Sequence, residues 1–158
     1  MRYQDVVIRV TESALSDFFR TARAVPEDKL EWSPLDQGRS VLDQAQEVAQ
    51  APAFFQMLIE KKAFPEFKPE QMEKAMEQRK SWKTIDECEE ACKKYSDSFY
   101  NLIRDYPDED LEIMINLPWG GGMVKSIADV MLFHYWNILY HTGQVNYIQT
   151  LYGDKEMH

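Results

Sequence analysis

Apolar residues recur every three or four positions in four long stretches of this chain, which places them on one face of an α-helix. The spacing is most regular in residues 84–107, where it forms a heptad seam: Ile85, Cys88, Cys92, Tyr95, Phe99, Leu102 and Tyr106. Three further helices are predicted over residues 3–24, 40–59 and 126–152, with Ser40 and Ser126 as N-caps. Four long amphipathic helices predict an all-α four-helix bundle.

The connections between these helices are long. Residues 27–38 form a predicted loop, and the charged residues 63–82 predict a loop followed by a short, mostly solvated helix. Apolar and polar residues alternate over residues 111–117, which predicts a short extended segment before a glycine-rich turn. Connections of this length permit a crossed order of helices and can cover one end of the bundle, where a site would lie.

The composition narrows the class of partner. The chain has 27 acidic and 18 basic residues and a net charge of −9, which argues against nucleic acid and anionic lipid, since both bind through Lys and Arg. No stretch approaches the roughly 18 apolar residues of a membrane span, and the N-terminus lacks the apolar core of a signal peptide. We therefore expect one cytoplasmic domain over residues 1–158, with no nucleic-acid or membrane partner.

Two motifs that invite a chemical interpretation are better explained by structure. Cys88 and Cys92 lie four residues apart within the heptad seam, so we expect buried thiols and not a redox or zinc site. The sequence from Gly120 to Ser126 resembles a phosphate-binding loop, but Val124 stands before the lysine where such a loop requires glycine.

The last helix holds the most informative polar residues. His134 and His141 lie two turns and about 10 Å apart, too far for easy joint metal ligation, whereas Asn137 and His141 have the closer i, i+4 spacing. Both histidines could equally be neutral core residues bonded to neighbouring Tyr or Gln side chains. Glu47 lies close to the apolar face of the second helix, where it either pairs with a metal or an imidazolium or reaches water from the boundary.

Several short motifs follow one another along the chain: Trp32-Ser33-Pro34, Ser40-Val41-Leu42-Asp43-Gln44-Ala45-Gln46-Glu47, Trp119-Gly120-Gly121-Gly122, Ser126 and His141-Thr142-Gly143-Gln144. Together they resemble the DinB/YfiT-like superfamily over nearly the whole chain. The resemblance implies a DinB-like four-helix bundle with crossed, up-down-down-up helix order. It also implies a homodimer and metal-dependent chemistry, since characterised relatives include transferases or isomerases that use low-molecular-weight thiols.

The resemblance also implies a site. The three histidine ligands of the family fall, by position, on Glu47, Asn137 and His141, so that only His141 matches. His134 is a substitute ligand for Asn137, which would give a Glu/His/His set suited to Zn²⁺ or Ni²⁺. Gln144 would orient the imidazole of His141. The same residues could instead form a closed hydrogen-bond network without a metal.

Two hypotheses follow. The first is an enzyme, a divalent-metal-dependent thiol transferase or hydrolase with a degenerate metal site. The second is a non-catalytic bundle that has lost the metal and binds a small molecule or acts as a dimeric interaction module. The chain has only three histidines, and one of them, His158, is the last residue. A three-histidine site would need all of them, so we expect either a site that includes a carboxylate or no metal site.

Overall fold

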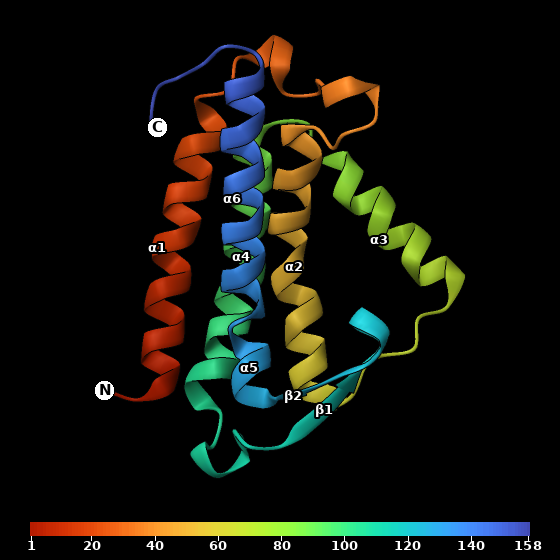
Figure 1. Ribbon diagram of the computed structural model, residues 1–158. Coiled ribbons are helices and arrows are strands. Elements are labelled where there is room, and N and C mark those ends of the chain that lie inside the picture. Colours follow the sequence, from red (N-terminus) through yellow and green to blue (C-terminus); the bar gives the residue numbers. More distant parts are fainter.

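Four long helices form the bundle in the computed structural model, which describes residues 1–158 (Figure 1). They are α1 (Tyr3–Arg23), α2 (Val41–Lys61), α4 (Ile85–Asp105) and α6 (Phe133–Leu151). In Figure 1, α1 and α6 run upward, and α2 and α4 run downward. Helices α1 and α2 each pack against α4 and α6 and touch one another little, so they lie on a diagonal. The predicted four-helix bundle is confirmed.

Side-chain caps fix the start of three helices. The Ser40 hydroxyl accepts a hydrogen bond from the Asp43 N–H, and the Thr84 hydroxyl accepts one from the Glu87 N–H. Ser126 and Asp129 form the predicted capping box, because each side chain accepts a hydrogen bond from the backbone N–H of the other residue. These bonds satisfy N–H groups that the first turn of a helix cannot pair.

The last predicted helix is divided in two, which is a correction to the sequence analysis. A short α5 (Ile127–Met131) is followed by a tight turn at Leu132, whose N–H donates to the Asp129 carbonyl three residues back. Helix α6 then begins at Phe133. The turn contains no proline or glycine, so the sequence carries no local signal for it.

The predicted extended segment is one strand of a hairpin whose second strand the sequence analysis did not predict. β1 (Met114–Leu117) pairs antiparallel with β2 (Met123–Ser126). The three glycines between them, Gly120 to Gly122, have φ angles of 60°, 82° and 101°. Residues with side chains rarely adopt these angles, so the glycine run serves the turn of this hairpin.

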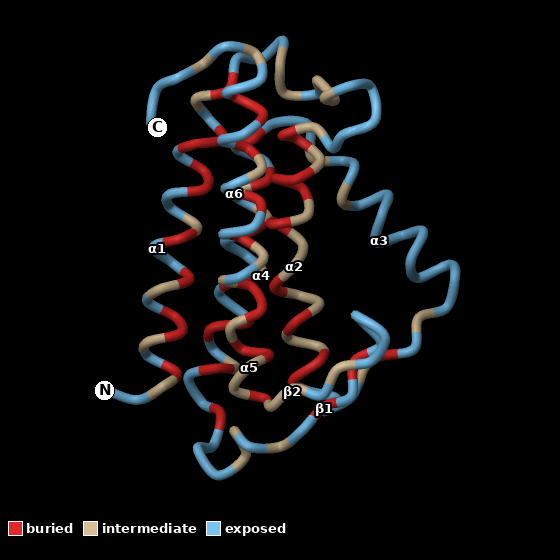
Figure 2. Tube along the Cα trace, viewed as in Figure 1, coloured by how far each residue is buried: buried red, intermediate tan, exposed pale blue.

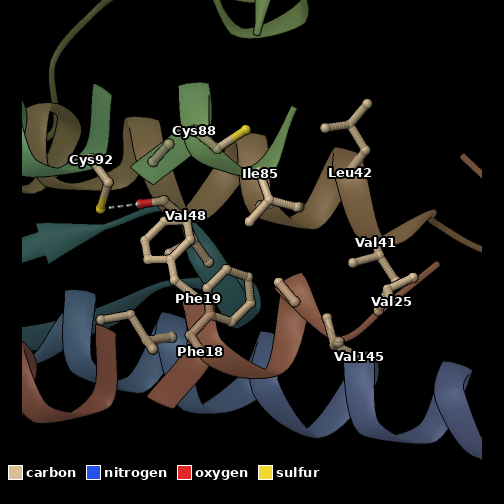
Figure 3. Packing of buried hydrophobic residues seen from close by; sticks show 14 of the residues in the cluster. Phe18, Phe19, Val25, Val41, Leu42, Val48, Ile85, Cys88, Cys92 and Val145 are labelled. Atoms are coloured by element: carbon tan, nitrogen blue, oxygen red, sulfur yellow. Dashed lines mark hydrogen bonds between the residues drawn. The ribbon is translucent and has the colours of Figure 1, made fainter. Parts of the chain in front are cut away.

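The core follows the inner faces of the long helices (Figure 2). Figure 3 shows Cys88 and Cys92 packed in it with Phe18, Phe19 and Val48. Burial raises the pKa of each thiol to about 12, so both stay protonated and unreactive. The prediction of buried thiols is confirmed.

Helix α3 (Pro69–Ser81) lies outside this core and contributes no buried residue, as the prediction of a short solvated helix required. Figure 2 shows it exposed along its length, beside α2. None of the helices combines the length and the apolar character that a membrane crossing needs.

Candidate functional site

Three of the predicted site residues meet between α2 and α6. Glu47 lies in the second turn of α2, and its Oε1 is 3.0 Å from Nε2 of His141 and 3.2 Å from Nδ2 of Asn137 on α6. The i, i+4 spacing of Asn137 and His141 brings both side chains to the same carboxylate oxygen. The structure thus joins Glu47, Asn137 and His141 into one polar cluster.

The imidazole of His141 is held from its other side as well. Its Nδ1 is 3.0 Å from Oε1 of Gln44 and 3.2 Å from Oε1 of Gln144. Side-chain oxygens of Gln44, Gln144 and Glu47 face the two ring nitrogens and fix the orientation of the ring. Only 1% of the His141 side chain is exposed, which makes it the buried centre of the cluster.

Two arginines complete the cluster, and the sequence analysis did not identify either. Arg39 Nη1 is 2.6 Å from Oε2 of Glu47, and Arg79 Nη2 is 3.4 Å from the same oxygen. Arg79 also donates to the carbonyl and to the carboxylate of Asp43. The i, i+4 spacing of Arg39 and Asp43 was the one available sequence signal, whereas Arg79 comes from the exposed helix α3.

These contacts decide the charge state of Glu47. The hydrogen bond from His141 is the largest effect, and the charges of His141 and Arg39 act in the same direction against partial burial. Together they hold the pKa of Glu47 far below its usual value of 4.5. Glu47 is therefore ionised in the folded protein, with Arg39 and Arg79 as its cationic partners.

His134, the proposed substitute ligand, is not brought into this cluster. Its ring lies between Phe55 and Phe99, with centroid distances of 6.3 Å to each. The side chain is completely buried, and neither ring nitrogen has a hydrogen-bond partner. Burial lowers the pKa of His134 to about 3, so the ring is neutral.

The chemistry of the cluster does not fit a divalent metal. Zinc sites in proteins use three or more Cys, His, Asp or Glu ligands, and no group of three such side chains is placed to hold an ion. Both ring nitrogens of His141 are already engaged by the side-chain oxygens of Gln44, Gln144 and Glu47. The guanidinium groups of Arg39 and Arg79 already balance the carboxylates of Glu47 and Asp43.

A cavity of about 1210 Å³ opens beside the cluster, with Glu47 and Asn137 in its wall. It lies between α2, α3, the hairpin region and α6. Its wall is mostly apolar and includes seven aromatic side chains and four methionines: Phe54, Phe55, Phe67, Tyr95, Trp119, Phe133, Trp136, Met57, Met72, Met76 and Met123. Of this wall, the sequence predicted Glu47 and Asn137 as site residues. It gave no signal for the residues from α3, because they lie on no apolar face of a core helix.

Helix α3 is attached at the rim of this cavity by polar contacts. Gln50 Nε2 donates to the carbonyl of Ala75, and Gln78 Nε2 donates to the hydroxyl of Tyr95. Arg79, at the end of α3, adds the contacts with Asp43 and Glu47. One wall of the cavity is thus held mainly by hydrogen bonds and ion pairs.

Comparisons with known proteins bear on the fold. No protein-family model matches this chain, and no curated protein matches it in sequence. Among solved structures it is similar to YfiT from Bacillus subtilis, described as a probable metal-dependent hydrolase with an unusual four-helix bundle topology. The TM-score is 0.75 at 14% identity, over 95% of this chain and 87% of that chain. The fold expected from the resemblance is confirmed: the chain shares the four-helix bundle fold of YfiT.

Proposed function

We propose that this chain is a small-molecule-binding bundle whose site works without a metal. The observation that carries the proposal is the open cavity of about 1210 Å³ with an apolar wall and a polar cluster at one end. Concave, mostly apolar sites with a few fixed polar groups are typical of small-molecule binding. The closed network around Glu47 supports the second of the two sequence hypotheses.

The metal-dependent hydrolase or thiol transferase remains the competing hypothesis. It is supported by the description of YfiT and by the meeting of Glu47 and His141 at the cavity. A metal site here would require the Glu47 carboxylate to release Arg39 and Arg79 and to bind the ion in their place. The homodimer and the cytoplasmic location expected from the sequence stay predictions.

Binding of an apolar probe tests the proposed function. We expect the neutral dye N-phenyl-naphthylamine to fluoresce strongly with the native protein, because the cavity wall removes it from water. The substitution Ala75→Trp, on the side of α3 that lines the cavity, should weaken dye binding at least tenfold by filling the space. Fluorescence titration measures both affinities.

The matched control is Glu73→Trp, which places the same side chain on α3 at a residue outside the cavity wall. This variant should bind the dye as the wild type does. Equal affinity for all three proteins, or no binding by any of them, would contradict the proposed function.

Metal addition separates the two hypotheses. We expect no stoichiometric Zn²⁺ or Ni²⁺ in purified protein by mass spectrometry, and no rise in Tm when either ion is added. The variant His141→Ala should lower the free energy of unfolding by about 3 kcal/mol, because it breaks a buried charged network, without changing metal content. Metal uptake that His141→Ala abolished while leaving Tm unchanged would favour the enzyme.

A further inference from the structure

The cavity is long as well as large. Along α2 its wall extends from Glu47 to Lys61, about 21 Å at a rise of 1.5 Å per residue. Its volume of about 1210 Å³ exceeds the roughly 300–1,000 Å³ of common ligand clefts. An extended ligand can contact the apolar wall along this whole length. A compact ring system would leave much of the wall in contact with water.

The two ends of the cavity differ in the charge that they offer a ligand. At the Glu47 end, both oxygens of the carboxylate are engaged by His141, Asn137 and the two arginines, so no unpaired charge is left. At the other end, Lys61 in the last turn of α2 and Lys125 on β2 line the wall, and neither forms a salt bridge. The neighbouring Lys62 is paired with Asp110 and does not contribute.

The balance at the lysine end matches a singly charged anion. Glu66, which also lines the wall there, sets one carboxylate against the two ammonium groups. The remaining single positive charge suits a carboxylate better than a doubly charged phosphate. In Figure 1 the C-terminal end of α2 and the hairpin both lie at the lower end of the molecule, and Lys61 and Lys125 line the same cavity.

We propose that the cavity binds a long-chain carboxylate, with its head group at Lys61 and Lys125 and its alkyl chain along the aromatic and methionine wall. This inference rests on the proposed function, since the chain needs the apolar cavity. Methionine side chains adapt their shape to an alkyl chain more readily than branched residues do. The net charge of −9 repels anions elsewhere on the surface, so the preference depends on these two lysines.

Calorimetric titration with decanoate, decanol and decylamine below their micellar concentrations tests the inference. For the wild type we expect decanoate to bind about tenfold more tightly than decanol, and decylamine to bind most weakly. Each further methylene on the carboxylate should raise affinity about fourfold until the chain fills the cavity. The double variant Lys61→Gln/Lys125→Gln should bind decanoate and decanol equally.

The control is Lys74→Gln/Lys80→Gln, which removes the same charge from α3 residues outside the cavity wall and should keep the preference for decanoate. Equal binding of decanoate and decanol by the wild type, or a preference that survives in the Lys61/Lys125 variant, would overturn the carboxylate inference and leave the apolar site standing. Binding of none of the three probes would overturn the proposed function as well.

Discussion

The substitution Glu47→Gln is expected to lower the free energy of unfolding by about 2 kcal/mol and Tm by roughly 4–8 °C. It keeps the shape of the side chain but removes the charge that Arg39, Arg79 and His141 share. Removal of one partner from a fully buried pair costs more than this, but 31% of the Glu47 side chain is exposed, and water reduces the cost. Chemical and thermal denaturation measure the change.

The pH dependence of this loss gives a sharper test. The pKa of Glu47 is lowered on folding, so its stabilisation is complete above its usual value of 4.5 and is lost as pH falls toward the folded pKa. The stability difference between wild type and Glu47→Gln should therefore be constant at neutral pH and shrink below about pH 4.5.

The control for this variant is Glu60→Gln on the same helix, where the carboxylate is exposed and accepts a hydrogen bond only from Gln56. It should change stability by less than about 0.5 kcal/mol. If Glu47→Gln were equally mild, or its effect did not change down to pH 3, the network would not have the role described above.

The substitution His134→Leu is expected to act in the opposite direction and raise the free energy of unfolding by about 1–3 kcal/mol. Both ring nitrogens of His134 are buried without partners, so the folded state loses hydrogen bonds that the unfolded chain makes with water. An apolar side chain of similar size between Phe55 and Phe99 removes this loss. Urea denaturation measures the gain.

Lower pH should enlarge the difference in stability between the wild type and His134→Leu. Burial lowers the pKa of His134 from 6.5 to about 3, so the unfolded state binds a proton across that range and the folded state does not. Wild-type stability therefore falls as pH drops below about 6.5, and His134→Leu removes this part of the fall.

His141→Leu is the matched control, because His141 is equally buried on the same helix but fully hydrogen-bonded. That variant should destabilise the protein. Loss of stability in His134→Leu would contradict the prediction and would point to a partner for its ring nitrogens.

Helix periodicity and capping residues predicted the positions of most helices. Period and caps placed α1, α2 and α4, and the Ser126 capping box marks the start of α5. The break at Leu132 had no such signal, and β2 is too short to show a pattern of its own. Such features depend on tertiary packing, which the spacing of apolar residues along the chain does not reveal.

In the candidate site, too, the sequence predicted some residues and missed others. Glu47, Asn137 and His141 were found because their spacing on two helices could be compared with a known motif. Arg39 and Arg79 were missed because one precedes a helix and the other lies on a solvated one, where arginine is ordinary. Only the folded structure shows that their charges converge on the same carboxylate.

Residues on helix α3 can change the cavity wall without changing the core. Because it contributes no buried residue, substitutions at Met72, Ala75 or Met76 change the cavity wall without loosening the packing of the bundle. Selection for a different ligand can therefore act on one exposed helix at little cost in stability. A library of variants confined to these positions should yield altered binding preferences among proteins that fold equally well.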